Sequence, residues 1–280
     1  MVKLHIKKFD ISNIQDDNVI VAIGKRKSGK SYVVKDLLYY HRDIPVGTLV
    51  SGTEDSNKAF SSNIPCMFIH SDCTTELLEK VLRRQKVMMK RLQKELEEYG
   101  KSSLDPRAFV ILDDCLHDSS WTRDKNMKYI FFNGRHRKLL TVITMQYPLG
   151  IPPNMRTNID YVFIMRENNF QNRKRLYEAY AGMFPTFEMF CNVLDACTEN
   201  FECLVIDNTV KSNKLQDQVF WYKAEDHGQY TMCCKSAWDL HNEIMLNKRD
   251  SSDEDSDGEQ MWSPETFVKK NKMRLSVVKQ

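Results

Sequence analysis

The chain has 280 residues, of which 41% are hydrophobic and 28% are charged, a composition that can bury a sizeable core and excludes a disordered polymer. Its 41 basic and 38 acidic residues give a net charge of +3, but six of the acids lie between Asp250 and Glu259 without a single base. Outside that stretch the 41 basic residues face 32 acidic ones. A basic body of this kind suits a polyanionic ligand.

The eight cysteines and the first residues of the chain indicate a reducing compartment. No apolar signal segment opens the sequence, so we expect a protein that is not secreted and whose cysteines are mostly buried free thiols. The cysteines form no C-x-x-C pair, which leaves a structural zinc site with little support. No apolar run approaches the roughly 20 residues of a membrane span, so we expect none.

Short apolar segments, rich in Val, Ile, Leu and Phe, alternate with longer helical patterns along the chain. They predict strands at residues 19–23, 48–51, 67–70, 109–112, 140–145 and 161–165. Continuous apolar runs are typical of parallel strands that are buried on both faces. The pattern therefore predicts an α/β fold, with a mostly parallel sheet and helices on both of its faces.

A long helix is predicted at residues 74–99, with Thr74 or Thr75 as its N-cap and Gly100 at its end. Its apolar residues form one stripe, and the opposite face is basic, either as a solvated face or as a nucleic-acid contact. Further helices are predicted at 168–181 and 186–196, and two more strands at 201–206 and 219–222. We expect residues 1–246 to form one domain and residues 247–280 a disordered, acidic then basic tail.

A phosphate-binding loop follows the first predicted strand and precedes a helical pattern. The sequence satisfies G-x-x-x-x-G-K-[ST] with Gly24, Lys25, Arg26, Lys27, Ser28, Gly29, Lys30 and Ser31. Glycines let successive amides converge on phosphate oxygens at the helix start. We expect Lys30 to reach the β- and γ-phosphates and the Ser31 hydroxyl to bind Mg²⁺.

Two carboxylates follow the apolar segment at 109–112, as they do in a Walker B strand. We expect Asp113 to bind Mg²⁺ through water and Asp114 to orient or deprotonate the attacking water. Many ATPases carry Glu at the second position, so Asp114 is one methylene shorter than the usual base.

Two further candidates come later in the chain. Gln146 ends the strand predicted at 140–145, where it senses the γ-phosphate or simply caps the strand before Pro148. Arg156 follows the two prolines of a stiff loop before the next strand. It is either an arginine finger offered to a neighbouring subunit or an ordinary surface arginine.

Together these motifs resemble one family. The P-loop, the Asp113-Asp114 strand end, the Thr144-Met145-Gln146 strand end and the Pro-Pro-Asn-Met-Arg loop before Asp160 are similar, in this order, to the poxvirus-type genome-packaging ATPases of large nucleocytoplasmic DNA viruses. These belong to the FtsK–HerA superfamily, and the resemblance covers about residues 19–222. It implies a RecA-like P-loop NTPase fold with an additional strand between the Walker A and Walker B strands, which residues 48–51 could supply.

The resemblance also implies a function and partners. It implies a homo-oligomeric ring that hydrolyses ATP with Mg²⁺ and drives double-stranded viral DNA, without sequence preference, into a preformed capsid during virion assembly. A capsid or portal component would be a partner. The protein would be located in the host cytoplasm at the viral assembly site, or in the virion. When the family's motifs are matched to this sequence by position, the catalytic candidates are Lys30, Asp114, Gln146 and Arg156. The metal ligands would be Ser31 and Asp113. Arg135 and Arg137 are alternative arginine fingers or DNA contacts.

Other functions stay open on the sequence alone. A P-loop nucleotide or small-molecule kinase would share the loop, as would a nucleotide-dependent DNA-binding protein with little turnover. A GTPase would carry an N-K-x-D signature, whereas Asn271-Lys272 is followed by Met273-Arg274 without the Asp. Since a translocating motor needs only phosphate contacts, its DNA contacts would lie in basic clusters. The candidates are residues 135–138, 173–175 and 269–274.

Overall fold

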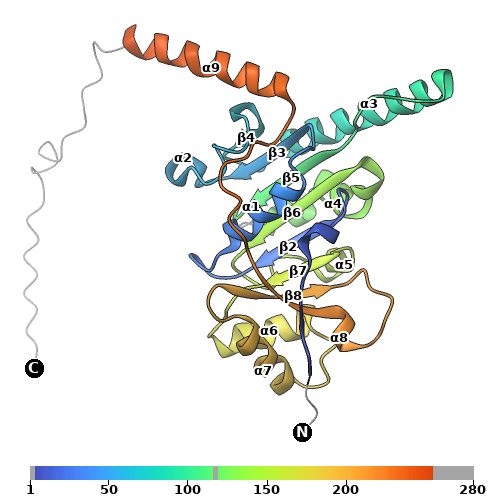
Figure 1. Cartoon of the computed structure of the whole chain (residues 1–280), viewed down its shortest axis with the longest axis vertical. Helices are drawn as coiled ribbons and strands as arrows, with labels where there is room; N and C mark the ends of the chain where they lie inside the picture. Colours follow the sequence, from blue (N-terminus) through green and yellow to red (C-terminus); the bar gives the residue numbers. More distant parts are fainter. Residues whose placement is uncertain (1–3, 116–118, 255–280) are drawn as a thin grey trace, which may run out of the picture. The chain divides into compact units, whose positions relative to one another are not determined.

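The computed structural model describes residues 4–115 and 119–254 of the chain. The described residues form a nine-stranded sheet, drawn in Figure 1. Its strands are β1 (Lys7–Lys8), β2 (Val19–Ile23), β3 (Val46–Ser51), β4 (Ile69–His70), β5 (Ala108–Asp113), β6 (Leu139–Met145), β7 (Tyr161–Ile164), β8 (Glu202–Asp207) and β9 (Val219–Lys223).

The order of the strands confirms the predicted fold class. The sheet runs β1-β9-β8-β7-β2-β6-β5-β3-β4. All neighbouring strands pair in parallel except β8, which is antiparallel to both β7 and β9. An additional strand does separate the Walker A strand β2 from the Walker B strand β5, but it is β6 and not the expected segment 48–51. That segment belongs to β3, which lies on the far side of β5, because the chain returns to the centre of the sheet only after β5.

Helices cover both faces of the sheet, as predicted. The α-helices of the described residues are α1 (Lys30–Tyr40), α2 (Glu54–Asn57), α3 (Thr75–Tyr99), α4 (Lys125–Asn133), α5 (Pro153–Arg156), α6 (Phe170–Tyr180), α7 (Phe187–Cys197), α8 (Leu215–Gln218) and α9 (Lys235–Glu254).

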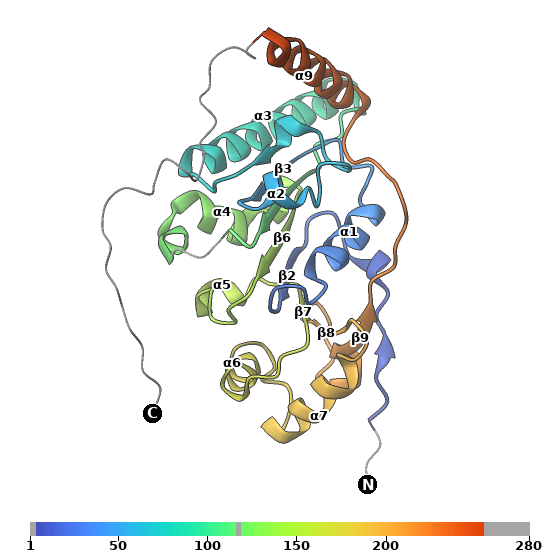
Figure 2. The same cartoon turned by 90° about the vertical axis from the view of Figure 1, so that its left-hand side faces the viewer.

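Alternate residues of the buried strands pack into two separate hydrophobic cores, one on each face of the sheet. In β2, Val19, Val21 and Ile23 pack with residues of α3, α4, α6 and α7, whereas Ile20 and Ala22 pack with α1 and the N-terminal segment. Figure 2 shows α1 on one side of the sheet and α4 and α6 on the other. Because both faces are covered, every residue of β2, β5, β6 and β7 is buried.

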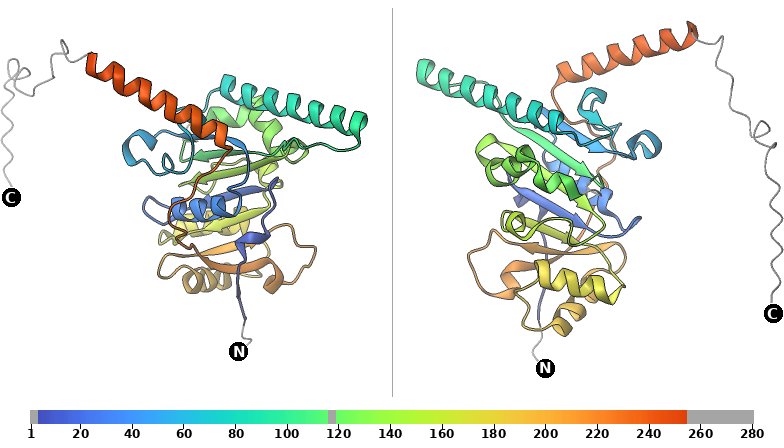
Figure 3. Two further views of the ribbon diagram at one scale, coloured as in Figure 1. Left: turned by 45° about the horizontal axis from the view of Figure 1, so that its top comes forward. Right: turned by 180° about the vertical axis from the view of Figure 1, so that it is seen from behind.

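The ends of α3 follow the capping pattern read from the sequence. The Thr74 hydroxyl accepts a hydrogen bond from the Leu77 amide, and Gly100 ends the helix with φ of +67°. Only the first half of α3 contributes buried residues, namely Leu78, Val81 and Gln85. The second half extends past the sheet, as Figure 3 shows.

Two predictions need correction in detail. The strand expected at 67–70 is largely a single 3₁₀ turn, Cys66–Phe68, and only Ile69 and His70 pair with β3. Helices α4 and α9 lie in segments for which no helix was predicted. Helix α9 runs to Glu254, past the predicted domain boundary at residue 247, and the rest of the predicted tail lies outside the described residues.

Contacts divide the chain into two units, residues 1–238 and 239–280. The first unit contains the whole sheet and helices α1 to α8. All the predicted catalytic and metal-binding residues therefore lie in this unit.

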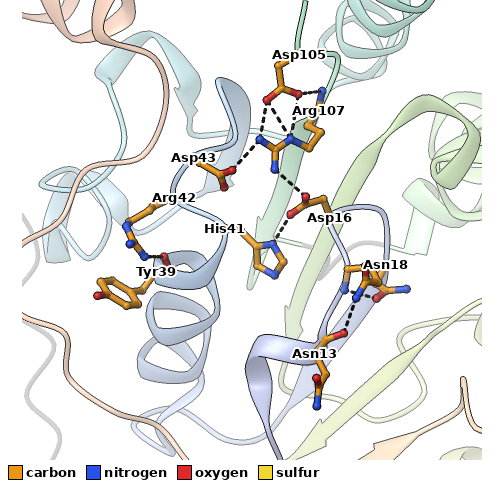
Figure 4. A network of polar contacts seen from close by, with 10 residues as sticks. Asn13, Asp16, Asn18, Tyr39, His41, Arg42, Asp43, Asp105 and Arg107 are labelled. Carbon is orange, nitrogen blue, oxygen red and sulfur yellow. Dashed lines mark hydrogen bonds and ion pairs between the residues drawn. The ribbon is translucent and has the colours of Figure 1, made fainter.

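An ion-pair network stabilises the amino-terminal edge of the sheet (Figure 4). His41 Nδ1 donates to Asp16 at 2.6 Å, and Arg107 donates to Asp16, Asp43 and Asp105 at 2.8, 2.8 and 2.7 Å. These residues stand before β2, after α1 and before β5. The network therefore joins three segments at the edge opposite to the one that carries the P-loop.

Candidate functional site

The loop of residues 24–31 joins β2 to α1, and its backbone needs both glycines of the motif. Gly29 has φ of +99°, a left-handed conformation that side chains disfavour. A Cβ on Gly24 would lie 2.5 Å from the Cβ of Met165, just past the end of β7. The Ser28 hydroxyl donates to the Lys25 carbonyl at 2.8 Å and closes the loop. The loop therefore has the tight curvature that a phosphate cradle requires.

Lys30 opens α1 and points into this loop. The residue is 8% exposed, and its Nζ donates to the carbonyls of Gly24 at 2.7 Å and Lys25 at 2.9 Å. Burial lowers the pKa of Lys30, and the negative charges of Asp114 and Asp113 act against that shift. The structure thus brings the loop lysine within electrostatic reach of both carboxylates.

Asp113 ends β5 in a row of polar residues that crosses three strands. The register aligns it with Ser51 of β3 on one side and Thr144 of β6 on the other. Thr144 Oγ1 donates to Asp113 at 2.7 Å and Ser51 Oγ at 3.3 Å. Burial raises the pKa of the Asp113 carboxyl, which is 6% exposed, and the two hydroxyl donors act to lower it. Both hydroxyls therefore help to hold Asp113 as a carboxylate.

Asp114 adopts a left-handed conformation, with φ of +49°, that turns the chain out of the sheet. Its amide donates to Thr144 Oγ1 at 3.0 Å, and Gln146 Nε2 donates to its carboxylate. Gln146 follows β6, the strand next to β5, as predicted. The candidate base and the candidate sensor are therefore in direct contact, and Thr144 contacts both aspartates.

Ser31 and Asp113 offer a hydroxyl and a carboxylate, the hard oxygen donors that suit Mg²⁺. Among the described residues, no group of three or more His, Cys, Asp or Glu could hold a metal by itself. Mg²⁺ normally completes its coordination with waters and substrate phosphates. The donors present therefore fit a magnesium ion that binds together with a nucleotide.

Glu167 supports the P-loop, and no sequence motif pointed to it. Its carboxylate accepts from Lys25 Nζ at 2.7 Å and from the Asn169 amide at 2.7 Å. Burial acts to raise the pKa of Glu167, but the hydrogen bonds from Lys25, Asn169 and Asn172 hold it below its ordinary value. Its only signal in the sequence is an acidic residue three positions past β7, at the same edge of the sheet as the loop.

The predicted arginines lie away from these groups within one chain. Arg156 Nε donates to the Ile151 carbonyl at 2.7 Å, and its guanidinium lies 5.5 Å from the Tyr180 ring centre. Arg135 pairs with Asp160 at 2.6 Å, and Arg137 contacts the Tyr129 hydroxyl at 2.9 Å. Arg135 and Arg137 precede β6 and so stand at the edge opposite to the P-loop.

A cavity of about 550 Å³ opens beside the loop and the start of α1. Its walls are Lys27, Ser28, Gly29, Lys30, Ser31, Tyr32, Phe201, Lys223 and Ala224. The site as a whole is thus a phosphate-type loop with a buried lysine, two strand-end aspartates, a glutamine and an adjoining cavity. This arrangement can bind a phosphorylated ligand and act on it with a carboxylate base.

The fold is shared with a viral genome-packaging protein. The structure of the genome packaging NTPase B204 from Sulfolobus turreted icosahedral virus 2, in complex with AMP, superposes with a TM-score of 0.52. It has 13% sequence identity and covers 76% of this chain and 100% of B204. At this identity the similarity establishes the fold alone. No helix in the described part of the chain is long and apolar enough to span a membrane.

Sequence relatives come from large DNA viruses, although no family model matches the chain. The uncharacterized protein L437 of Acanthamoeba polyphaga mimivirus is 38% identical over 240 residues, which cover 85% of this chain and 84% of L437. The uncharacterized protein 075L of Invertebrate iridescent virus 6 is 39% identical over 229 residues, 78% of this chain and 85% of that protein. The chain therefore belongs to a family of large-DNA-virus proteins that includes L437 and 075L, and it has a P-loop NTPase fold.

Proposed function

We propose that this chain is a Mg²⁺-dependent ATPase that drives double-stranded viral DNA into a preformed capsid. The observation that carries the proposal is the convergence of Lys30, Asp113, Asp114 and Gln146 at one edge of the sheet. Parallel strands β2, β5 and β6 all end there, at the edge where open α/β sheets bind ligands.

Each residue has a role that its contacts support. The amides of the loop and the Lys30 ammonium bind the β- and γ-phosphates. Ser31 and Asp113 would hold a magnesium ion, which would neutralise negative charge on the phosphates. Asp114 orients the attacking water and accepts its proton, and Gln146 fixes the Asp114 carboxylate by its hydrogen bond and acts as the γ-phosphate sensor.

The packaging role rests on the comparisons and on the sequence resemblance. B204 is named a genome packaging NTPase, and the relatives L437 and 075L come from viruses of the kind to which the resemblance pointed. A homo-oligomeric ring with Arg156 as a finger in trans, a capsid or portal partner, and the viral assembly site in the host cytoplasm all belong to this proposal. So does the narrower poxvirus-type assignment.

The charges on the described surface bear on where DNA would bind. Two of the predicted basic clusters are largely paired: Arg135 with Asp160, Lys138 with Asp17, Arg173 with Asp195 and Lys174 with Glu178. The third cluster, at 269–274, lies outside the described residues. Among the described residues, the exposed face of α3 carries more positive charge without an ion-pair partner than these two clusters do. We therefore place the main contacts with DNA phosphates on α3.

The proposal is tested by measuring ATP binding and hydrolysis for the wild type, Lys30→Ala and Asp114→Asn. Lys30→Ala should lose nucleotide binding, because it removes the only buried cation of the loop among the described residues. Asp114→Asn should still bind ATP with Mg²⁺ but turn it over roughly 10²- to 10⁴-fold more slowly, the usual contribution of a general base. A wild type that hydrolyses ATP no faster than Lys30→Ala would contradict the proposal.

Duplex DNA provides the second arm of the experiment. The ATPase rate of the wild type should rise when double-stranded DNA of arbitrary sequence is added, and Asp114→Asn should show no such rise. An ATPase that ignores DNA would favour a P-loop enzyme with a small-molecule acceptor, which phosphate transfer to candidate acceptors would reveal.

A further inference from the structure

The cavity beside the P-loop has two aromatic walls that phosphate binding does not require. Tyr32 is 67% exposed and Phe201 is 74% exposed, although both are large hydrophobic side chains. Tyr32 belongs to the first turn of α1, whereas Phe201 precedes β8, far along the chain. Both line the cavity that also contains Gly29, Lys30 and Ser31.

The pairing of β8 with β9 places Phe201 at this cavity. Glu202 is the first residue of β8 and aligns with Lys223, the last residue of β9. In an antiparallel pair the next residues outward, Phe201 and Ala224, come to the same end. That end is the edge of the sheet where β2 leads into the P-loop, because β9 runs parallel to β2.

The backbone holds Phe201 in this exposed position at a cost. Asn200 and Phe201 both have left-handed conformations, with φ of +49° and +64°. A bulky residue without a glycine's freedom rarely adopts this region, and such strain concentrates at ligand sites. The turn is anchored on both sides, by Thr198 Oγ1 donating to the Leu194 carbonyl at 2.6 Å and by the Glu202 amide donating to the Glu199 carbonyl at 2.8 Å.

The size and charge of the cavity suit a nucleotide. Its volume of about 550 Å³ lies within the usual range for small-molecule sites. Its charged walls are Lys27, Lys30 and Lys223, with no acidic residue among the lining side chains. The neighbouring hollow, which shares Tyr32, is instead lined by Asp36, Glu225 and Asp226 and contains no residue of the loop.

We propose that this cavity holds the base of the bound nucleoside triphosphate, and that Phe201 is the surface on which a purine ring stacks. The inference rests on the proposed ATPase function. It adds a ligand-binding residue, Phe201, that is distant in sequence from the P-loop. Stacking on an aromatic face supports any base and favours the larger purines. Phe201 therefore contributes affinity for the nucleoside part and leaves phosphate binding to the loop.

The test compares ATP with inorganic tripolyphosphate, which has the phosphates but no base. Equilibrium binding of both, with Mg²⁺, is measured for the wild type, Phe201→Ala and Phe201→Trp. Phe132→Ala is the matched control, because Phe132 is also exposed but lies in α4, beside a different hollow at the opposite edge of the sheet. Thermal unfolding of each variant establishes that it is folded.

Phe201→Ala should weaken ATP binding by about 5- to 100-fold, the effect of losing one base–aromatic stack. Its affinity for tripolyphosphate should stay within a factor of about two of the wild type. Phe201→Trp should retain ATP affinity, with an indole fluorescence that ATP quenches and tripolyphosphate does not. Phe132→Ala should bind both ligands like the wild type.

The outcomes separate this inference from the proposed function. An unchanged ATP affinity in Phe201→Ala would overturn the inference while the ATPase proposal stands. Equal losses for ATP and tripolyphosphate would also overturn it, since Phe201 would then act on the loop rather than on the base. A wild type that binds neither ligand would overturn the proposed function, and the inference with it.

Discussion

Single residues at the site differ in how visible they are in the sequence. Lys30, Asp113 and Asp114 stand in contiguous motifs, so strand and loop patterns predict them directly. Ser51 and Thr144 do not, because their contacts with Asp113 depend on which strands flank β5. Their signal in the sequence is weak: each is a hydroxyl residue at or near the end of a strand that also contains a second hydroxyl residue, a threonine.

Asp16 gives a prediction about stability. Changing Asp16→Asn keeps the shape but removes the charge that accepts hydrogen bonds from His41 and Arg107. We expect the free energy of unfolding at pH 7 to fall by about 1 kcal/mol, the usual size for partly exposed charged hydrogen bonds. Urea denaturation measures the change, and Asp72→Asn, at an exposed carboxylate with no ion pair in the described residues, is the control.

The same network predicts how the difference in unfolding free energy between the wild type and Asp16→Asn depends on pH. The hydrogen bond from His41, with that from Arg107, lowers the pKa of Asp16 from 3.8 to about 2. A carboxyl group whose pKa is lower in the folded state than in the unfolded state stabilises the folded protein at any pH above its unfolded-state pKa. This stabilisation is lost as the pH falls through the folded-state pKa. The difference between wild type and Asp16→Asn should therefore be full above about pH 4 and fade between about pH 4 and pH 2. A difference that is constant down to pH 2 would contradict the role of the charge.

At the scale of elements, α3 differs from the other helices in the charge that it exposes. From Lys80 to Lys94 it carries seven basic residues and no acidic one. Lys86, Lys90 and Lys94 repeat every four residues on one exposed stripe. Like Arg91, they form no ion pair within the part of the chain that the structure describes. An unpaired row of this kind is suited to the regularly spaced phosphates of a duplex.

This row predicts a change in the salt dependence of DNA binding. Replacing Lys86, Lys90 and Lys94 by Gln keeps the helix propensity while removing three charges. The slope of log affinity for duplex DNA against log salt should decrease in magnitude by about 2 to 3, near 0.9 per lost phosphate contact. Affinity measured by fluorescence anisotropy at several salt concentrations gives the slope.

A matched control separates position from net charge. Gln at Lys7, Lys211 and Lys214, three exposed lysines outside α3 and outside the predicted basic clusters, removes the same charge. This control variant should keep nearly the wild-type slope. Equal decreases in both variants would assign the effect to overall charge and remove α3 as the contact.

At the scale of the whole molecule, one chain does not bring Arg156 to the aspartates. Its contacts with Ile151 and Tyr180 hold it on the α5–α6 side of the sheet. Under the proposed function, Arg156 would therefore complete the site of a neighbouring subunit, as trans fingers do in P-loop enzymes.

Mixing inactive subunits tests that arrangement. Arg156→Ala and Lys30→Ala should each be nearly inactive alone, but an equal mixture should recover roughly a quarter of the wild-type sites if each site joins two subunits. ATP hydrolysis of the mixture with duplex DNA is the measurement. If the mixture never exceeds the mean of the two variants, Arg156 does not act in trans.

The sequence by itself determined the α/β class, most of the strands, the caps of α3 and the Walker residues. These features are local: a buried parallel strand reads as an apolar run, and a phosphate loop is contiguous in the chain. The strand order was decided only by the tertiary structure, which put β6 rather than β3 beside β2. The same is true of the Ser51 and Thr144 donors, the Lys25–Glu167 ion pair and the placement of Phe201 at the cavity beside the P-loop. Each of these joins segments distant in sequence, and only the register of paired strands brings such segments together.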